Sequence, residues 1–260
     1  MLPHDEVGSG PAVVLLHAGI ADRTMWSEHL PPLADAGFRA VALELPGFGE
    51  APVADGEQAP WTDVLAAMDG LGIERAALVG NSFGGAVALR VAVVAPERVS
   101  ALVLVSAPAP GIAPSAELEA LWEAEESALE RGDVEAAVRA VAEGWTSPDA
   151  PAALRDRVAA MQRRTYELQD DTAEVAEAPD PLDEHPETLA SIAVPALVAV
   201  GDSDLEDFRR GAEALARTLP RSRLVTIEGA GHLAPLEAPA RFRELLLEFL
   251  REQKRPPGAP

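Results

Sequence analysis

The chain has 260 residues, 48% of them apolar, and a formal net charge of −22 at pH 7. This is enough apolar material for a substantial core in one large or two small domains. The absence of cysteine excludes disulfides and thiolate metal sites. A surface this acidic would repel a phosphate backbone or an anionic membrane, so we expect neither nucleic acid nor a membrane as a partner. No apolar run approaches the roughly 18 residues that span a bilayer, and the N-terminus lacks the basic region of a secretory signal, so we expect a cytoplasmic protein.

Short runs rich in Val, Ala and Leu recur along the chain and are predicted to be buried strands. They cover residues 12–17, 39–45, 75–80, 99–106, 194–201 and 222–229. Their apolarity is continuous rather than alternating, which is typical of parallel strands covered on both faces. The helical segments between and after them cover residues 26–37, 61–72, 83–96, 208–220 and 239–253. This alternation predicts an α/β fold with a doubly wound, mostly parallel sheet.

The alternation is interrupted over residues 108–194, which begin and end in Pro-rich, acidic stretches. Three amphipathic helices with no strand among them are predicted there, over residues 117–133, 134–145 and 151–169. Helices inserted at the carboxyl edge of an open α/β sheet would cover the place where such sheets bind ligands. We therefore expect a core formed by residues 1–107 and 195–253, an all-helical lid over 108–194 and a disordered tail over 254–260.

Residues 77–93, ALVGNSFGGAVALRVAV, place the pattern Gly-x-Ser-x-Gly between a predicted strand and a predicted helix. On such a turn the Ser82 hydroxyl is held out at the sheet edge, and the flanking glycines leave room for a strained backbone. The helix N-terminus offers N–H groups and a positive dipole end to a developing oxyanion. A serine becomes a good nucleophile when a histidine base, oriented by a carboxylate, takes its proton. The alternative interpretation is a Gly- and Ser-rich turn before a helix.

Candidate partners of Ser82 follow it in the order acid and histidine, each just after a predicted strand. GDSDLEDF, residues 201–208, holds four acids, and EGAGHLAPLEAP, residues 228–239, holds His232 in a Gly-rich loop. A lone loop histidine is more often merely solvated, and surface acids are common in this chain. The coincidence of the three placements nevertheless favours a Ser-acid-His triad.

The first of these apolar runs leads into LLHAGIADRTMW, residues 15–26. If that strand neighbours the strand before Ser82, a backbone N–H after His17 can supply half of an oxyanion hole, and Phe83 can supply the other half. Gly19 permits the close approach. The His17 side chain is expected to be structural and to hold this loop from behind the site. The remaining histidines are expected on the surface: His4, His29 and His185.

Five segments resemble landmark motifs of the α/β-hydrolase superfamily, in particular its small, lidded bacterial members: LLHAGIADRTMW, ALELPGFGEA, LVGNSFGGAVAL, VAVGDSD and GAGHLAPLEAP. The resemblance extends over residues 2–252. It implies Ser82 as the nucleophile and His232 as the base. It implies Asp204 as the acid, because the usual acid falls three residues after the loop glycine. Of the neighbouring acids, Asp202 is expected to brace the loop and Asp207 to cap the helix that follows.

The same resemblance implies that the backbone N–H groups of Gly19 and Phe83 are the oxyanion donors, with Ile20 as a less favoured donor. The loop reads His-Ala-Gly where many relatives have His-Gly. Members usually begin with two antiparallel strands, and we expect the first of these to be missing because only residues 2–7 precede GSGP. Ser rather than Asp at position 82 argues against the dehalogenases and epoxide hydrolases that use an aspartyl ester.

The substrate class is indicated by two motifs that point in different directions. GNSFGG is similar to carbon–carbon hydrolases of aromatic meta-cleavage pathways, yet those typically have an Asn in the oxyanion loop and a Trp where Leu233 follows His232 here. GHLAPLEAP more closely resembles 3-oxoadipate enol-lactonases and carboxylesterases. We therefore predict hydrolysis of a small-molecule carboxylic ester through an acyl-enzyme, with enol-lactone or C–C bond hydrolysis as the alternative. A non-catalytic ligand receptor on the same fold is a further alternative.

The predicted lid contains several large side chains that either pack it on the core, the favoured interpretation, or line a substrate pocket: Trp122, Trp145, Met161 and Tyr166. The candidate substrate contacts are Ile20, Trp122, Trp145, Tyr166 and Leu233. No metal and no cofactor are predicted, because no His and acid cluster has ligand spacing and no dinucleotide-binding G-x-G-x-x-G pattern occurs. The chain is expected to be a monomer or a homodimer.

Overall fold

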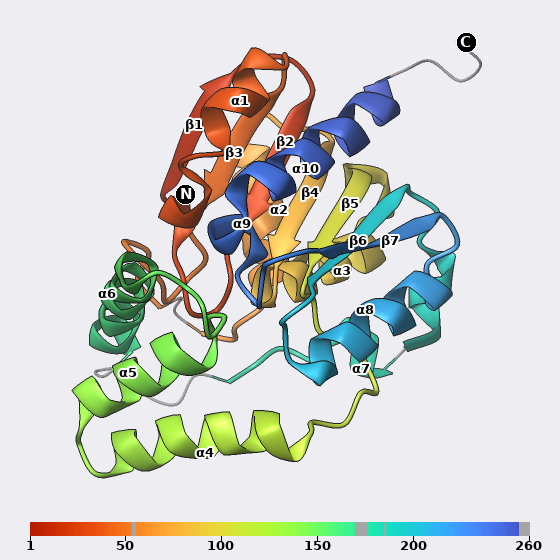
Figure 1. Cartoon of the computed structure of the whole chain (residues 1–260). Helices are drawn as coiled ribbons and strands as arrows, with labels where there is room; N and C mark the ends of the chain where they lie inside the picture. Colours follow the sequence, from red (N-terminus) through yellow and green to blue (C-terminus); the bar gives the residue numbers. More distant parts are fainter. Residues whose placement is uncertain (54–55, 170–175, 185, 255–260) are drawn as a thin grey trace.

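The computed structural model describes residues 1–53, 56–169, 176–184 and 186–254. These residues form a seven-stranded sheet in the order β1-β3-β2-β4-β5-β6-β7 (Figure 1). The strands are β1 His4–Gly8, β2 Ala12–Leu16, β3 Arg39–Leu43, β4 Ala76–Asn81, β5 Val99–Val105, β6 Ala196–Gly201 and β7 Ser222–Ile227. β1 is antiparallel to β3, whereas the other strand pairs are parallel. The predicted doubly wound, mostly parallel sheet is therefore confirmed.

Helices cover both faces of this sheet (Figure 1). One face is covered by α1 Leu30–Asp35, α9 Ala234–Glu237 and α10 Pro239–Lys254, and the other by α2 Pro60–Gly70, α3 Phe83–Val94 and α8 Glu206–Thr218. Short 3-10 helices connect several elements: η1 Arg23–Trp26, η2 Pro96–Arg98 and η3 Pro186–Ser191. One long helix was predicted over residues 26–37. The chain forms η1 and α1 instead, because Pro31 and Pro32 favour the first turn of a new helix.

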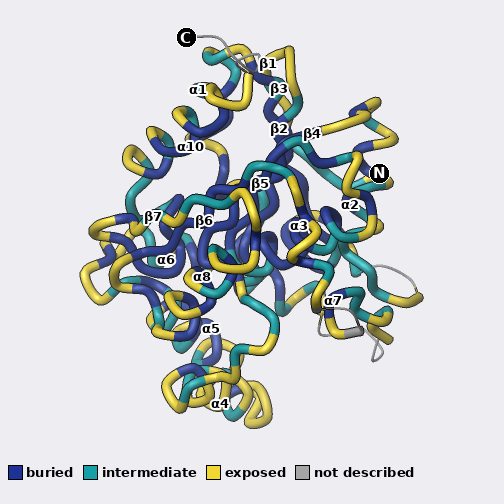
Figure 2. The backbone as a smooth tube through the Cα atoms, turned by 90° about the vertical axis from the view of Figure 1, so that its right-hand side faces the viewer, coloured by how far each residue is buried: buried dark blue, intermediate teal, exposed yellow. Residues whose placement is uncertain are grey.

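The strands are apolar on both faces, which divides the core into two layers. In β2, Val14 and Leu16 face the layer that contains α2 and α3, whereas Val13 and Leu15 face the layer under α1 and α10. Figure 2 shows the sheet and the inner sides of its helices as buried, with exposed residues at the helix surfaces and loops. Burial on both faces explains the continuous apolar runs in the sequence.

Between β5 and β6, the described residues form helices and no strand. We call α4, α5 and α6 the inserted helices, and the helices of this region are α4 Ala116–Glu130, α5 Val134–Gly144, α6 Ala152–Gln169 and α7 Pro181–Glu184. Two begin at side-chain caps, since Ser115 Oγ accepts the Leu118 N–H at 3.2 Å and Asp133 accepts the Ala136 N–H at 2.9 Å. Figure 1 shows the inserted helices beside the sheet edge at which β4 and β5 end.

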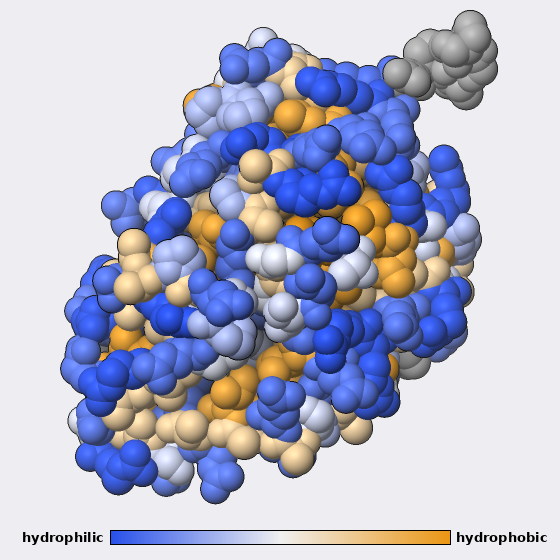
Figure 3. All heavy atoms as spheres, viewed as in Figure 1, coloured by the Kyte–Doolittle hydropathy of each residue, from blue (hydrophilic) through white to orange (hydrophobic). Residues whose placement is uncertain are grey.

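The surface in Figure 3 is mostly hydrophilic, with apolar residues between the polar ones. No helix in the described ranges is long and apolar enough to cross a bilayer. Lys254, predicted to begin a disordered tail, instead ends α10. Its ammonium donates to the carbonyls of Ala36 and Gly37 at 3.2 and 2.7 Å and lies 3.6 Å from the centre of the Phe38 ring. The rest of that predicted tail, residues 255–260, lies outside the described residues.

Candidate active site

Ser82 occupies a strained turn between β4 and α3. Its φ and ψ are 52° and −115°, a conformation that costs a residue with a Cβ about 1–3 kcal/mol. The turn depends on two glycines. A Cβ on Gly80 would lie 2.2 Å from the Gly84 carbonyl oxygen, and one on Gly84 would lie 2.2 Å from the Leu16 carbonyl oxygen. The predicted strand-turn-helix is present, with Ser82 at the N-terminus of α3.

His232 and Asp204 form a buried pair on two neighbouring loops. His232 Nδ1 lies 3.0 Å from Asp204 Oδ1, which also accepts the Leu205 N–H at 2.8 Å. Because a carboxylate only accepts, Nδ1 carries the proton and Nε2 is the basic nitrogen of the neutral ring. The rings of Trp145 and Phe208 lie with centroids 4.7 and 4.2 Å from that of His232. These contacts fix the imidazole in one orientation.

Asn81, the only asparagine in the chain, joins the turn at Ser82 to the loop that carries His232. Its Nδ2 donates to the carbonyls of Val105 and His232, each at 3.1 Å. The residue before Ser82 is therefore in direct contact with His232. The turn at Ser82 is thereby bonded, through Asn81, to the loop of the His232–Asp204 pair. This structural role of Asn81 was not predicted from the sequence.

Asp202 was predicted to brace its own loop, the one that carries Asp204, and its carboxylate also braces the loop that carries His232. Its carboxylate accepts the Gly229 N–H at 3.0 Å and the Ala230 N–H at 3.3 Å. The hydrogen bond from Gly229, with smaller contributions from Ser203 and Ala230, holds the pKa of Asp202 below its usual range. Asp202 therefore joins the loop after β6 to the loop after β7.

Asp207 does not cap α8, and that prediction was wrong. The capping position belongs to Leu205, so Asp207 lies within the first turn and points toward α4. Its carboxylate accepts the N–H and the hydroxyl of Ser115 at 2.6 and 2.7 Å. Burial alone would raise the pKa of Asp207, but the hydrogen bonds from Ser115 hold it below its usual range. The core is bonded through this carboxylate to the N-terminus of α4.

The backbone at Gly19 lies close to Phe83, the other residue predicted to supply an oxyanion donor. A Cβ on Gly19 would lie 3.4 Å from the Phe83 Cβ. Neither the Gly19 N–H nor the Phe83 N–H has an acceptor among the described residues. Two unpaired N–H groups beside a serine are suited to stabilising a developing O⁻. Ile20, the less favoured donor, is partly buried and packs its side chain on the layer under α1 and α10.

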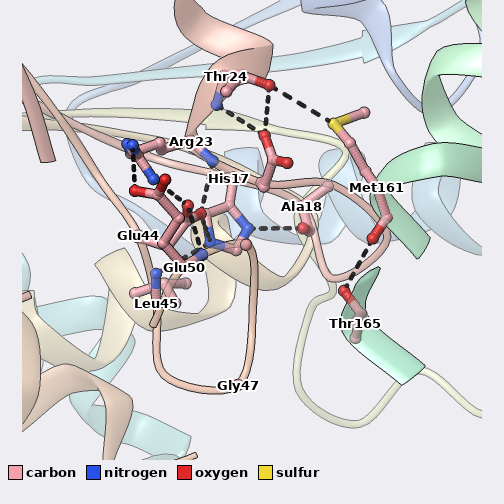
Figure 4. Close-up of polar contacts among 12 residues, drawn as sticks. His17, Ala18, Arg23, Thr24, Glu44, Leu45, Gly47, Glu50, Met161 and Thr165 are labelled. Atoms are coloured by element: carbon pink, nitrogen blue, oxygen red, sulfur yellow. Dashed lines mark hydrogen bonds and ion pairs between the residues drawn. The ribbon is translucent and has the colours of Figure 1, made fainter. Parts of the chain in front are cut away.

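His17 is a structural residue behind this loop, as predicted. Its Nδ1 donates to the Ala18 carbonyl at 2.8 Å, and its Nε2 accepts the Leu45 N–H at 3.0 Å (Figure 4). Both contacts suit a neutral imidazole, and burial lowers the pKa of His17 to about 4. His17 therefore joins the end of β2 to the chain after β3.

Arg23 and Glu44 complete this support, and sequence analysis singled out neither residue. Glu44 is fully buried and accepts the Arg23 N–H at 2.7 Å and the Arg23 guanidinium at 2.6 Å (Figure 4). Burial raises the pKa of Glu44, although the bonds from Arg23 oppose that effect. Arg23 also pairs with Asp5 and Glu50 at 3.2 and 2.8 Å. The segment that contains Gly19 is thus held between His17 and Arg23.

Of the side chains predicted on the inserted helices, Trp145 and Met161 lie against the core. Trp145 contacts His232, and Met161 is buried with its Sδ 3.9 Å from the Thr24 hydroxyl (Figure 4). The Tyr166 hydroxyl donates to Glu125 at 2.6 Å, so this side chain joins α6 to α4.

Two other predicted substrate contacts, Trp122 and Leu233, differ in burial, and their contacts with a substrate stay predictions. Trp122 is 47% exposed, because the inner face of α4 follows Leu118 and Ala128 and Trp122 lies beside that stripe. Leu233 is fully buried and packs in the layer under α1 and α10.

His29 is buried, so its predicted surface position was wrong. Its Nε2 lies 3.0 Å from the Pro235 carbonyl oxygen, and its ring contacts Trp26 and Phe242. Pro235 of α9 and Phe242 of α10 are remote from His29 in sequence, so local context could not reveal these partners. Burial lowers the pKa of His29 to about 4. His4 is partly exposed, and His185 lies outside the described residues.

No group of three or more His, Cys, Asp or Glu side chains within the described ranges is placed to hold a metal ion.

Comparisons with known proteins agree with this architecture. A family model described as alpha/beta hydrolase fold matches residues 11–239. A 2-hydroxy-6-oxo-6-phenylhexa-2,4-dienoate hydrolase of Comamonas testosteroni is 40% identical over 111 residues, which cover 40% of this chain and 39% of that protein. The match thus spans about two fifths of that relative's length. A 2-hydroxy-6-oxononadienedioate/2-hydroxy-6-oxononatrienedioate hydrolase of Burkholderia vietnamiensis is 29% identical over 95% of this chain and 90% of its own. The structure of a thermophilic esterase from Thermogutta terrifontis with malate bound superposes with a TM-score of 0.80, at 29% identity over 98% of this chain and 94% of that one.

Proposed function

Because the chain belongs to the α/β-hydrolase family, we propose that it is a serine hydrolase that cleaves small-molecule carboxylic esters through an acyl-enzyme. Ser82 is the nucleophile, His232 the general base and Asp204 the acid that orients it. The observation that carries this proposal is the buried hydrogen bond of 3.0 Å between His232 and Asp204, on a loop that Asn81 bonds to the turn at Ser82.

The proposed reaction follows from these positions. Ser82 Oγ attacks the ester carbonyl carbon while His232 Nε2 takes the hydroxyl proton, and Asp204 stabilises the imidazolium that forms. The backbone N–H groups of Gly19 and Phe83 stabilise the tetrahedral O⁻. Collapse of this intermediate breaks the ester bond, and the leaving alkoxide takes the proton from His232. Water then attacks the acyl-enzyme by the same steps, which releases the carboxylic acid and restores Ser82.

We assign the inserted helices to the role of a lid over residues 108–194, with residues 1–107 and 195–253 as the core. Three contacts support this role. Trp145 contacts the His232 ring, Arg157 donates to the Thr24 carbonyl at 2.6 Å, and Arg164 donates to the Gly49 carbonyl at 3.0 Å. The helices thereby contact the loops on both sides of Ser82. A lid in this position would exclude water from the acyl-enzyme and select the substrate.

The ester is the favoured substrate, and hydrolysis of a C–C bond in a dienoate or of an enol-lactone is the second candidate. The likeness to the esterase of Thermogutta terrifontis, over nearly the whole chain, supports the ester. The names of the Comamonas and Burkholderia relatives support the dienoate. A cytoplasmic location and a monomeric or homodimeric state stay predictions, as does the absence of nucleic-acid and membrane partners.

A side-by-side substrate panel tests the proposal. Purified protein is assayed against p-nitrophenyl esters of increasing acyl length, enol-lactones and 2-hydroxy-6-oxo-dienoates, with the Ser82→Ala variant as the matched control. The proposal predicts the highest kcat/KM on an ester and a loss of turnover in the variant. Turnover of dienoates with none of esters would assign the second candidate. Ligand binding without turnover of any compound would assign a receptor.

A further inference from the structure

The peptide groups on either side of His232 are held by one carboxylate, that of Glu237 in α9. Glu237 Oε2 accepts the Gly231 N–H at 2.8 Å, and Oε1 accepts the Leu233 N–H at 3.2 Å. These are the peptide N–H groups immediately before and after the proposed base. With the His232 carbonyl bonded to Asn81 at 3.1 Å, the backbone on both sides of His232 is fixed by side chains from other elements.

Gly231 allows this close contact. A Cβ at that position would lie 3.2 Å from each Glu237 carboxylate oxygen and 3.2 Å from the backbone nitrogen of Ser147. Such contacts are tighter than a side chain ordinarily makes, so the glycine lets the carboxylate and the lid segment approach the loop together. The sequence EGAGHLAPLE gives no sign of this arrangement beyond the five-residue spacing between His232 and Glu237.

The same carboxylate extends to the proposed lid. Glu237 Oε2 also accepts the Ser147 N–H at 3.2 Å. Ser147 belongs to the connection between α5 and α6, two residues after Trp145, whose ring contacts His232. Arg155 of α6 donates to the carbonyls of Ser147 and Pro148 at 3.0 and 2.6 Å, which holds this connection in place. Residues 145–147 therefore contact the His232 loop at two points, the imidazole ring and the Glu237 carboxylate.

Only a carboxylate satisfies these three donors. Glu237 presents two acceptor oxygens to three N–H groups, whereas a glutamine amide has one acceptor oxygen and an NH₂ group that would face an N–H. A mismatch of this kind leaves a donor unpaired and displaces the loop. Because proton transfer requires the base within hydrogen-bond reach of the nucleophile, a small displacement of His232 lowers the rate of the chemical step.

We propose that Glu237 is a positioning residue for His232 that couples the placement of residues 145–147 to the geometry of the base. This inference rests on the proposed function. The inference extends the proposed function by assigning a regulatory contact between the lid and the triad. A movement of the connection between α5 and α6 changes the position of His232 through Glu237, in addition to uncovering the site.

The test is the activity per active site of Glu237→Gln, with Glu244→Gln as the matched control. Glu244 lies on the exposed face of α10 and pairs with Arg241 at the surface. Active sites are counted by titration with a fluorophosphonate, so that unfolded protein does not contribute. We expect kcat per titrated site to fall about 10- to 100-fold in Glu237→Gln with KM nearly unchanged, since the base is displaced and the substrate contacts are not. Glu244→Gln should match the wild type.

Ser147→Pro tests the coupling separately, because it removes the N–H that the lid donates to Glu237 while it also fixes φ at this position. We expect it to lower kcat per titrated site by a smaller factor than Glu237→Gln, and it decides the question if Glu237→Gln does not fold. An unchanged kcat per site in Glu237→Gln, with only fewer titratable sites or a lower Tm, would overturn the positioning role. An unchanged kcat in Ser147→Pro would overturn the coupling. Failure of the proposed function is distinct, because the wild type itself would then neither titrate nor turn over.

Discussion

Ser82 and Ser106 are the two residues other than glycine with positive φ in the described chain, at 52° and 48°. They stand after β4 and β5, at adjacent strand ends. The Ser82 N–H donates to the Val105 carbonyl at 2.8 Å, and the Ser106 N–H to the Ala199 carbonyl at 2.8 Å. The sheet therefore holds both backbones in place and maintains the strain. Strain of this kind persists where the surrounding structure imposes it, as at a nucleophile that must project from a turn.

This strain predicts an unusual order of stability between two inactive variants. Ser82→Gly and Ser82→Ala both lack the hydroxyl, but only alanine retains the Cβ that disfavours φ of 52°. We expect Ser82→Gly to be the more stable variant by about 1 kcal/mol, since relief of strain outweighs the larger entropy of glycine in the unfolded chain. Urea denaturation of the two variants measures the difference. An alanine variant as stable as the glycine variant would show that Ser82 is not strained.

The candidate triad could be predicted from the sequence because each member lies in a short, recognisable loop after an apolar strand. Its supports could not. Asn81 and Asp207 act on partners that are close in space only after the sheet forms or the inserted helices pack, and the same holds for the contact of Glu237 with Ser147. No local pattern indicates those partners. The wrong capping role of Asp207 has this origin, because an acid beside a helix start is a typical cap in the absence of a tertiary partner.

Among the elements, α4 and α8 are joined at their N-termini. Ser115 caps α4 by accepting the Leu118 N–H, and its own N–H and hydroxyl donate to Asp207 in the first turn of α8. The start of the proposed lid is thereby bonded to the segment that follows Asp204. Most element boundaries were predictable from hydrophobic periodicity and from Gly and Pro, but the division of residues 23–35 into η1 and α1 was not. The packing of the inserted helices was not, because their sequences show which face is apolar but not which neighbour covers it.

Removal of this joint should loosen the start of the proposed lid. Asp207→Ala leaves the Ser115 N–H and hydroxyl without their acceptor, which we expect to cost about 1–3 kcal/mol. Cleavage by a nonspecific protease should become faster within residues 108–116. Glu206→Ala, an exposed neighbour in the same helical turn, is the control and should be cleaved as slowly as the wild type. Equal cleavage of the two variants would contradict the role of Asp207.

At the scale of the whole molecule, the response to acid is governed by buried neutral histidines as well as by the many surface acids. Burial lowers the pKa of His29 from 6.5 to about 4, and it lowers the pKa of His17 similarly. Between about pH 4 and pH 6.5, each of these histidines takes up a proton when the protein unfolds. Its contribution to the free energy of unfolding is therefore present above about pH 6.5 and is lost as the pH falls toward 4. Glu44, whose pKa burial raises, acts in the opposite direction.

His29 offers a test of this effect away from the candidate site. Between pH 7 and pH 5, the linkage costs about 2 kcal/mol of unfolding free energy for one histidine with these pKa values. His29→Gln cannot take up that proton, so the loss of stability between the two pH values should be about 2 kcal/mol smaller than in the wild type. Urea denaturation at both pH values gives the difference, which is independent of the variant's stability at pH 7. The same loss in both proteins would show that His29 is not held neutral.

The proposed reaction requires Ser82 as the nucleophile, and a covalent label tests that role directly. The wild type and Ser82→Ala are treated with a fluorophosphonate, analysed by intact mass and peptide mapping, and assayed on the best ester of the panel. We predict one adduct per wild-type chain, located on Ser82, with complete loss of activity. Ser82→Ala should carry no adduct and show no turnover. An adduct on another residue, together with ester hydrolysis that survives in Ser82→Ala, would contradict the account.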